Sequence, residues 1–535
     1  MADKWTAESS EHVKTGKVFV EKREITQSVD QVVEVDAESY DSDNTRRTLK
    51  NRHIQLIGIG GTIGTALFVQ IGQSLTHGGP ASLFIAFTLW CSVILAVNNC
   101  LSEMVTWIPI SSPFVRYADR FVDPALGFAA GVNFFIFEAA LIPFEMVAFN
   151  VVLQFWTEKI PTAAVICFLL VCYSYIGYRT DAFTFVTMVG GNPLHDVYGF
   201  RNWNPAKVEG APFAEYIKAG STGRFVGFLA CLIQASFTIA GPDYVSMTAG
   251  EAKNPRRNLP KAFKGVFYRL AGFFILGSLC VGIVVPYNDP DLLNAIANAH
   301  PGAGSSPYVI AMEHLHIPVL PHIVNALVLT AIFSAGNSYV FCASRTLFGL
   351  ALEGKAPRFL IRCTSNGVPM YCVGITLSIA SLAFLQLSQN SAIVLQWFVN
   401  LVTASQLLNY AIISFSYIRF HKALKALGVS RHDLPYRSFW QPFCGYVALQ
   451  SISLPRYYGF AATFIMAFVG GYTVFLPGHW DVPSFFFSYT MIAIVPILFA
   501  YWKIRHRSQW QNLKTMTFFD RERMIIDHYE EEKDS

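Results

Sequence analysis

Long apolar runs separated by short polar segments dominate the chain. The first run, Ile54–Gly72, carries no charge and is about as long as a bilayer-crossing helix, roughly 20 residues. Ten further runs follow it: Ala81–Met104, Pro124–Trp156, Ile160–Gly191, Phe225–Met247, Val266–Pro286, Pro318–Leu350, Val368–Leu387, Ser391–Tyr417, Tyr458–Leu476 and Val482–Trp502. This pattern predicts an all-α protein that crosses a lipid bilayer many times.

The centre of the first run is rich in glycine and threonine. The residues concerned are Gly58, Gly60, Gly61, Thr62, Gly64 and Thr65. Glycine at this density disfavours a continuous helix, and unwound backbone inside a membrane must line a cavity or be buried in protein. Helix ends at such a break direct free N–H groups at an anion such as an amino-acid carboxylate. Tight helix packing through the Gly60/Gly64 pair is the alternative, whereas the spacing fits neither nucleotide-binding glycine motif.

Composition excludes several classes of protein. Of 535 residues, 53% are hydrophobic and 14% are charged, which is not a soluble composition. The net charge of +4 gives no indication of nucleic-acid binding. We find no metal-spaced His/Cys cluster and no nucleophile motif, so we expect no metal, no cofactor and no enzymatic activity.

The polar ends of the chain predict its domain organisation. Residues 1–50 are polar and mixed in charge, without a signal peptide. We expect them to form a disordered cytosolic tail, followed by a membrane domain at 51–505 and a second cytosolic tail at 506–535.

Basic clusters between the runs predict the orientation. The clusters are Arg46–Arg52, Arg116–Arg120, Lys253–Lys264, Lys355–Arg362, Arg419–Lys425 and Lys503–Arg507. By the positive-inside rule all six are cytoplasmic, and so are both termini. Consecutive clusters should then be separated by an even number of spans, but only three candidates lie between Arg120 and Lys253. Because Ile160–Gly191 has 32 residues, it is too short for two spans of about 20 and a turn. The chain therefore looks one helix short.

At this point the sequence resembles a known family, the fungal amino-acid permeases of the amino acid–polyamine–organocation superfamily. The matching segments are LKNRHIQLIGIGGTIGTALF (Leu49–Phe68), FVRYADRFVDPALGFAAG (Phe114–Gly131), GEAKNPRRNLPKAF (Gly250–Phe263), SAGNSYVFCASRTLFGLALEGKAP (Ser334–Pro357) and FLPGHWDVPSFFFSYT (Phe475–Thr490). Details such as GPDYVSM (Gly241–Met247) look most like the dicarboxylic amino-acid permeases.

The resemblance implies an inverted-repeat transporter fold. The family has 12 helices, of which the first ten form two five-helix repeats, and this chain keeps about 11, with the fifth largely missing. The first and sixth helices of the family are broken around a midplane substrate site. The implied substrate-binding residues are Gly60, Gly61, Thr62, Gly64, Thr65, Phe237, Ala240 and Gly241. Pro242 is consistent with such a break, because proline removes a backbone N–H donor from the run Phe225–Met247.

Charged residues inside the runs are candidates for ion handling, because ionisable groups in lipid are expensive. Glu138 and Glu145 lie seven residues apart and so on one helix face. Glu145 follows Pro143-Phe144 and matches an acid of the family, which implies a role in proton coupling. Asp243 either shares that role or caps a half-helix, and a purely structural acid is the alternative for each. We expect Arg345 to extend toward the lipid headgroups.

The leading hypothesis is therefore proton-coupled uptake of an amino acid across the plasma membrane. The expected partners are a small amino acid, protons and the bilayer. Acidic amino acids as substrates rest on the resemblance alone, because we expect no Lys or Arg mid-span. One alternative is a permease-like amino-acid sensor. Another is an inactive chain from a mis-joined gene model or splice variant, since the short 160–191 region is matched by apparently extra sequence at Val447–Arg456.

Overall fold

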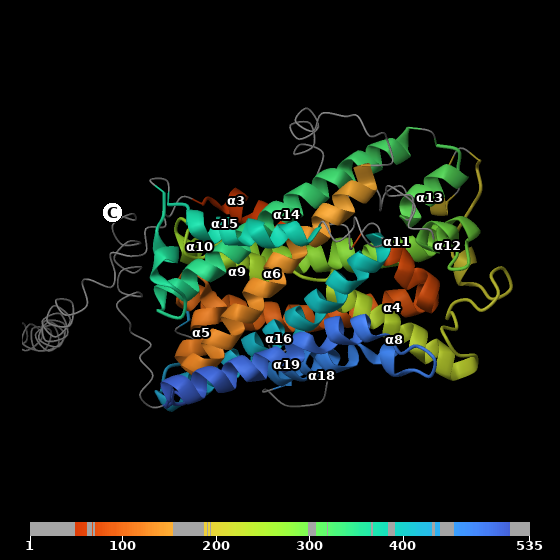
Figure 1. Cartoon of the computed structure of the whole chain (residues 1–535). Coiled ribbons are helices and arrows are strands. Elements are labelled where there is room, and N and C mark those ends of the chain that lie inside the picture. The colour runs from red at the N-terminus through yellow and green to blue at the C-terminus, as the bar shows by residue number, and fades with distance from the viewer. Residues whose placement is uncertain are drawn as a thin grey trace, which may run out of the picture.

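The computed structural model describes residues 49–60, 67, 70–153, 187–189, 191–192, 194–297, 306–317, 319–364, 367–383, 391–430, 434–438 and 454–513. Within these ranges the chain is helical, and its only β feature is an isolated bridge between Leu49 and Ala252. The predicted all-α class is confirmed (Figure 1).

The helices follow the predicted runs closely. They are α3 (Asn51–Gly60), α4 (Ile71–Trp107), α5 (Pro113–Phe121), α6 (Pro124–Leu153), α8 (Gly220–Thr238), α9 (Pro242–Met247), α10 (Pro255–Arg269), α11 (Gly277–Val284), α12 (Pro290–Ala297), α13 (Pro307–His314), α14 (Leu320–Leu352), α15 (Met370–Ala380), α16 (Ser391–Ala426), α18 (Leu454–Val469) and α19 (Val482–His506). A π-helical segment, η3 (Leu270–Leu276), joins α10 to α11, and a 3-10 turn, η8 (Tyr472–Phe475), follows α18.

Seven segments of the described chain are long and apolar enough to cross a membrane. They are Ile71–Trp107, Pro124–Met146, Gly220–Met247, Pro255–Val284, Leu320–Leu352, Gln396–Ala426 and Val482–His506. Two shorter apolar helices, Met370–Ala383 and Tyr457–Val469, match two further predicted spans. Most of the predicted span Ile160–Gly191, and Val447–Ser453 of the extra segment, lie outside the described residues.

One predicted boundary is wrong. The basic segment before Val266 is not a loop, because α10 begins at Pro255, whose fixed φ suits the first helical position. The polar segment 288–317 contains α12 and α13, which also begin at prolines. In α12 the Asp289 Oδ1 accepts from the N–H groups of Asp291 and Leu292, at 3.1 and 3.0 Å.

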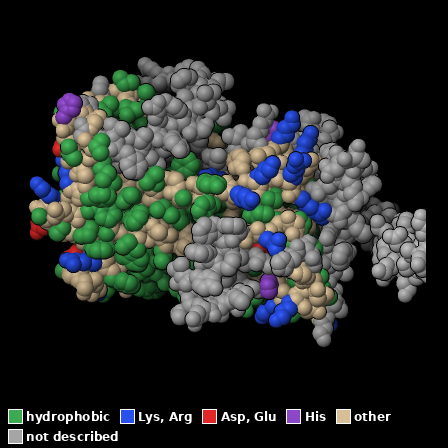
Figure 2. Space-filling view, turned by 180° about the vertical axis from the view of Figure 1, so that it is seen from behind, with side chains coloured by type: hydrophobic (Ala, Val, Ile, Leu, Met, Phe, Trp, Pro, Cys, Tyr) green, Lys and Arg blue, Asp and Glu red, His purple; other side chains and the backbone are tan. Residues whose placement is uncertain are grey.

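Five of the predicted basic clusters meet at one end of the bundle, which we call the basic end. There Lys355 pairs with Asp119 and Glu353, Arg116 pairs with Glu353 at 2.9 Å, and Lys503 pairs with Asp123. The amide of Lys253 donates to the Leu49 carbonyl at 2.9 Å, and Arg419 Nε donates to the Phe121 carbonyl at 3.1 Å. Figure 2 shows a dense group of Lys and Arg side chains at one end and apolar side chains over the middle of the molecule. The grouping predicted from charge is therefore present in the fold.

The segment 194–219 lies at the opposite end. Its Asn202 donates to the Ile283 carbonyl at 2.8 Å, and the Ala81 amide donates to the Pro212 carbonyl at 3.1 Å. The same end carries α12 and α13 (Figure 1). Residues 200 and 258 thus lie at opposite ends of the bundle. This arrangement agrees with the even number of crossings that the basic clusters require between Arg120 and Lys253.

Candidate functional site

The interruption predicted at Gly241-Pro242 separates α8 from α9. Helix α8 ends at Thr238, and Gly241 has φ +143° and ψ −38°, a conformation that favours glycine. Pro242 has no N–H to donate to the carbonyl of Thr238, four residues earlier. The Gly241 N–H donates instead to the Asp243 carboxylate at 3.2 Å. The chain therefore presents a helix break inside a candidate span, with an acid at its start.

Asp243 is held by a short polar chain from α16. The Tyr410 hydroxyl lies 3.5 Å from both Asp243 oxygens and accepts a hydrogen bond from Gln406 at 3.1 Å. All three side chains are almost completely buried. Asp243 thus accepts from the N–H of Gly241 at the start of the half-helix and belongs to a buried polar network, while its role in proton coupling stays a prediction.

The two glutamates of α6 lie on one face of the helix, as their spacing predicted, and this face is directed toward α14. Glu138 is within electrostatic range of Cys342 on α14 and of Asp243. A Cβ placed on Gly336 of α14 would lie 3.9 Å from the Glu145 Cβ. Glu138 is fully buried and Glu145 is 3% exposed. The fold therefore brings Glu138 close to Asp243, while Glu145 lies two helical turns further along α6.

An arginine that the sequence did not single out lies beside the first interrupted run. Arg269, at the junction of α10 and η3, is 6% exposed, and its Nη1 donates to the carbonyl of Gly58 in α3. The prediction that no Lys or Arg sits mid-span is wrong here. The cause is the early start of α10, which places Arg269 at the centre of the span Pro255–Val284 rather than in the first turn of the predicted run Val266–Pro286. A π-helical segment starts immediately after it, and such segments are frequent at functional sites.

The expectation for Arg345 is also wrong. Its guanidinium does not extend toward headgroups but pairs through Nε with Glu251, and both side chains are largely buried.

Of the remaining predicted substrate residues, the structure describes Phe237, Ala240 and Gly60. Phe237 and Ala240 are buried at the α8–α9 break, and the Phe237 ring meets Phe144 edge-on with centroids 5.6 Å apart. Gly60 is the last residue of α3. Gly61, Thr62, Gly64 and Thr65 lie outside the described residues, so carboxylate docking on this stretch stays a prediction.

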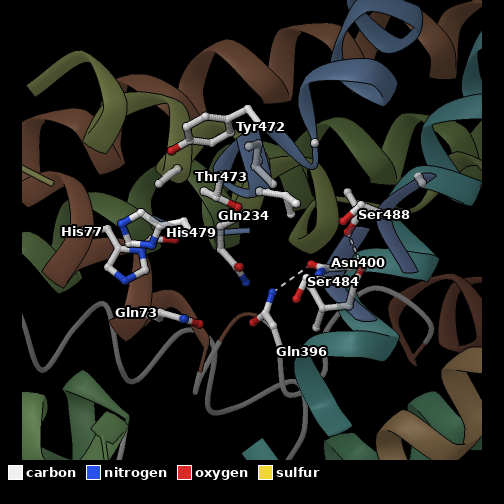
Figure 3. Close-up of a pocket in the computed structure, with 18 of the residues that line it drawn as sticks. Gln73, His77, Gln234, Gln396, Asn400, Tyr472, Thr473, His479, Ser484 and Ser488 are labelled. Atoms are coloured by element: carbon white, nitrogen blue, oxygen red, sulfur yellow. Dashed lines mark hydrogen bonds between the residues drawn. The ribbon is translucent and has the colours of Figure 1, made fainter. Parts of the chain in front are cut away.

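A polar cavity of about 340 Å³ lies on the side of the break away from the basic end. Side chains from α4, α8, α16, η8 and α19 face a common space there, including Gln73, His77, Gln234, Asn400 and Ser484 (Figure 3). At its wall Gln396 donates to Asn400 at 2.9 Å. Thr403 and Leu407 also line the cavity, and both are close neighbours of Gln406 on α16. Because Gln406 donates to Tyr410, these residues connect the cavity to the Tyr410–Asp243 network. Sequence reasoning missed this cavity because residues far apart in the chain supply its walls.

One group of possible metal ligands lies away from the break. The ligand atoms of Asp289, Asp291 and His314 lie within 4.8 Å of one another. Capping of α12 by Asp289 and a 2.9 Å hydrogen bond between His314 and Asp291 account for this arrangement.

Comparisons with known proteins bear on the family of the chain. The family model described as amino acid permease matches residues 53–184 and 180–514. The two matches meet at 180–184, inside the region where the sequence predicts a missing helix. The chain is 48% identical to the general amino acid permease AGP2 of Saccharomyces cerevisiae over 84% of this chain and 77% of that protein. It is 36% identical to the proline-specific permease of Emericella nidulans, over 87% of this chain and 86% of that one.

Further matches include a third permease and a distant structure. The basic amino-acid permease of Saccharomyces cerevisiae is 36% identical over 84% of this chain and 79% of that protein. Among solved structures, the nucleobase-cation-symport-1 family transporter Mhp1 aligns at a TM-score of 0.44 and 14% identity, over 91% of this chain and 99% of that one. The family match and the three relatives leave one assignment: the chain belongs to the amino acid permease family, whose members are multi-pass membrane transporters and not enzymes.

Proposed function

We propose that this chain imports an amino acid across the plasma membrane together with protons. The observation that carries the proposal is the α8–α9 break, where a buried Asp243 meets a backbone interrupted at Gly241-Pro242 in a member of the permease family. In this proposal residues 51–505 form the transport domain. The basic end and the tails 1–50 and 506–535 face the cytoplasm, by the positive-inside rule.

The substrate's two backbone charges have separate partners in this proposal. Its carboxylate docks on N–H groups in the stretch Gly60–Thr65. Its ammonium lies at the α8–α9 break, where the Thr238 carbonyl has lost its helical donor and Asp243 supplies negative charge. The polar cavity at the opposite end from the basic clusters is the entry to this site. Glu145 carries the coupled proton, with Asp243 as the second candidate.

The substrate's side chain is not determined by these contacts. Acidic amino acids, implied by the resemblance, stay a prediction, and the relatives compared above include general, proline-specific and basic amino-acid permeases. A sensor without flux and an inactive chain are the two alternatives that an uptake measurement separates from the proposal.

The test is uptake of radiolabelled proline, lysine and aspartate by cells that lack their own permeases and express the full chain. We expect at least one of them to accumulate faster at pH 5 than at pH 7, and a protonophore to abolish the accumulation. Surface-localised protein that accumulates none of a complete amino-acid panel would overturn the proposal.

A substitution tests the proposed docking site for the substrate's carboxylate. Gly61→Val adds a β-branched side chain to the unwound stretch and should abolish uptake while the protein still reaches the cell surface. Normal transport by this variant would contradict carboxylate docking there.

A further inference from the structure

Glu138 is a buried carboxylate for which the described residues supply no hydrogen bond. It lies at the middle of α6, is 0% exposed, and both of its oxygens lack a partner. A charged carboxylate in this position needs donors, and a protonated one still needs an acceptor for its O–H. Buried polar groups are almost always satisfied, so Glu138 requires a partner that the described residues do not supply.

The groups around Glu138 define the charge of that molecule. Asp243 on α9 and Cys342 on α14 lie within electrostatic range of Glu138, and so do Tyr244 and Tyr410. The site therefore contains two carboxylates. A cationic group rich in N–H donors would satisfy both carboxylates in their ionised form.

The buried cations of the neighbouring helices are engaged elsewhere. Arg345 of α14 pairs with Glu251, and Arg269 of α10 donates to the Gly58 carbonyl. Neither guanidinium is available to neutralise Glu138 from within the described part of the chain.

Aromatic rings complete the site. Tyr244 and Tyr339 pack with ring centroids 5.9 Å apart, from α9 and α14 respectively, and Tyr244 is within electrostatic range of Glu138. The faces of tyrosine rings attract an ammonium or guanidinium group. Carboxylates and aromatic faces together favour an organic cation.

We propose that Glu138, which lies beside Asp243, binds a positively charged side chain of the substrate, so that this permease selects cationic amino acids. The inference rests on the proposed function, in which the break at Gly241 holds the substrate's α-ammonium. Glu138 is then a specificity-determining residue. It lies in the same buried cluster as Asp243 but has no hydrogen-bond partner among the described residues.

Lysine and norleucine form the matched pair of substrates that tests this. Norleucine has the same carbon chain and lacks only the terminal ammonium group. In cells expressing the full chain we expect lysine uptake to exceed norleucine uptake at equal concentration, and aspartate uptake to be the lowest. Glu138→Gln keeps the shape and removes the charge, so the lysine-to-norleucine ratio should fall about tenfold, in line with loss of a hydrogen bond to a charged group.

Glu209→Gln, which makes the same change at an exposed position, is the control, and we expect it to leave the lysine-to-norleucine ratio unchanged. A Glu138→Gln ratio equal to that of the wild type would overturn the inference. So would an equal loss of both uptakes together with an altered pH dependence, since that result would assign Glu138 to proton binding. If no amino acid of the panel is taken up by the wild type, the proposed function fails instead.

A measurement on purified protein covers the case in which Glu138→Gln does not reach the surface. Lysine should raise the apparent Tm of the solubilised wild-type chain at concentrations where norleucine has no effect. Equal stabilisation by both ligands would contradict a cationic side-chain site.

Discussion

Arg269 donates from its Nη1 to the backbone carbonyl of Gly58 and thereby ties α10 to α3 inside the membrane domain. The space around Gly58 is tight, because a Cβ there would lie 2.9 Å from Val245 Cγ2 and 3.2 Å from Arg269 Nη1. Three elements thus meet immediately before the glycine-rich stretch, namely α3, the second half-helix α9, and α10.

The first prediction concerns this contact. Arg269→Met keeps the length of the side chain and removes the donor, so the protein should lose about 1.5–3 kcal/mol of stability, as expected for a hydrogen bond to a charged group. A lower apparent Tm of the purified protein and reduced uptake would show the loss. Arg269→Lys should recover part of it. Arg257→Met, an exposed position on the same helix, is the control and should match the wild type.

Arg269 also illustrates what the sequence could not supply. Apolar runs located the helices, and Pro242 located the second break, because a missing N–H is a local property. The depth of Arg269 depends on where α10 begins, and helix starts are set by caps and packing rather than by hydropathy. The isolation of Glu138 depends on which side chains of α9, α14 and α16 surround it, which is tertiary information. The glycine-rich break itself was predicted, but most of it lies outside the described residues.

The second prediction separates proton coupling from a structural role at Glu145. Glu145→Gln keeps the side chain's shape and removes its titration, so concentrative accumulation should fall strongly while exchange of substrate in preloaded cells persists. The measurement is accumulation and exchange of the same labelled amino acid at pH 5, 6 and 7, a range over which a buried carboxyl can change its charge. Unchanged accumulation at every pH would make Glu145 structural, and Glu145→Asp should restore part of the coupling.

The third prediction concerns pH and the ion pairs at the basic end. Burial raises the pKa of Asp119 to about 6, an effect that Lys355 opposes and Glu353 reinforces. The native carboxyl therefore holds its proton to a higher pH than the unfolded chain does, and stability should decrease as the pH rises from about 4 to about 6. Asp119→Asn cannot titrate, so its apparent Tm should change less over this interval than that of the wild type. Parallel pH profiles for the two proteins would contradict the assignment.

The last prediction concerns topology between α6 and α8. Lys207 and Arg257 are both exposed and lie at opposite ends of the bundle. In variants that each add one cysteine to the chain, Lys207→Cys should react with a membrane-impermeant maleimide on intact cells, and Arg257→Cys only after permeabilisation. The unmodified chain, whose described cysteines are mostly buried, gives the background.

Opposite labelling would have a definite consequence for the short segment. Helix α6 crosses once and α8 with α9 cross once, so residues 207 and 120 lie on opposite faces only if the chain between α6 and α8 adds an even number of crossings. Ile160–Gly191 has 32 residues, which at 1.5 Å per residue falls short of two full spans and a turn. The segment must then cross twice with shortened helices, enter and leave by one face, or stay outside. Each option removes part of the wall that a full fifth helix would form.

Because part of this wall would be missing, the hypothesis of an inactive chain expects weak uptake. Opposite labelling together with robust uptake would show that the permease works without a complete fifth helix, and labelling of both positions from outside would mean that the basic clusters do not set its orientation.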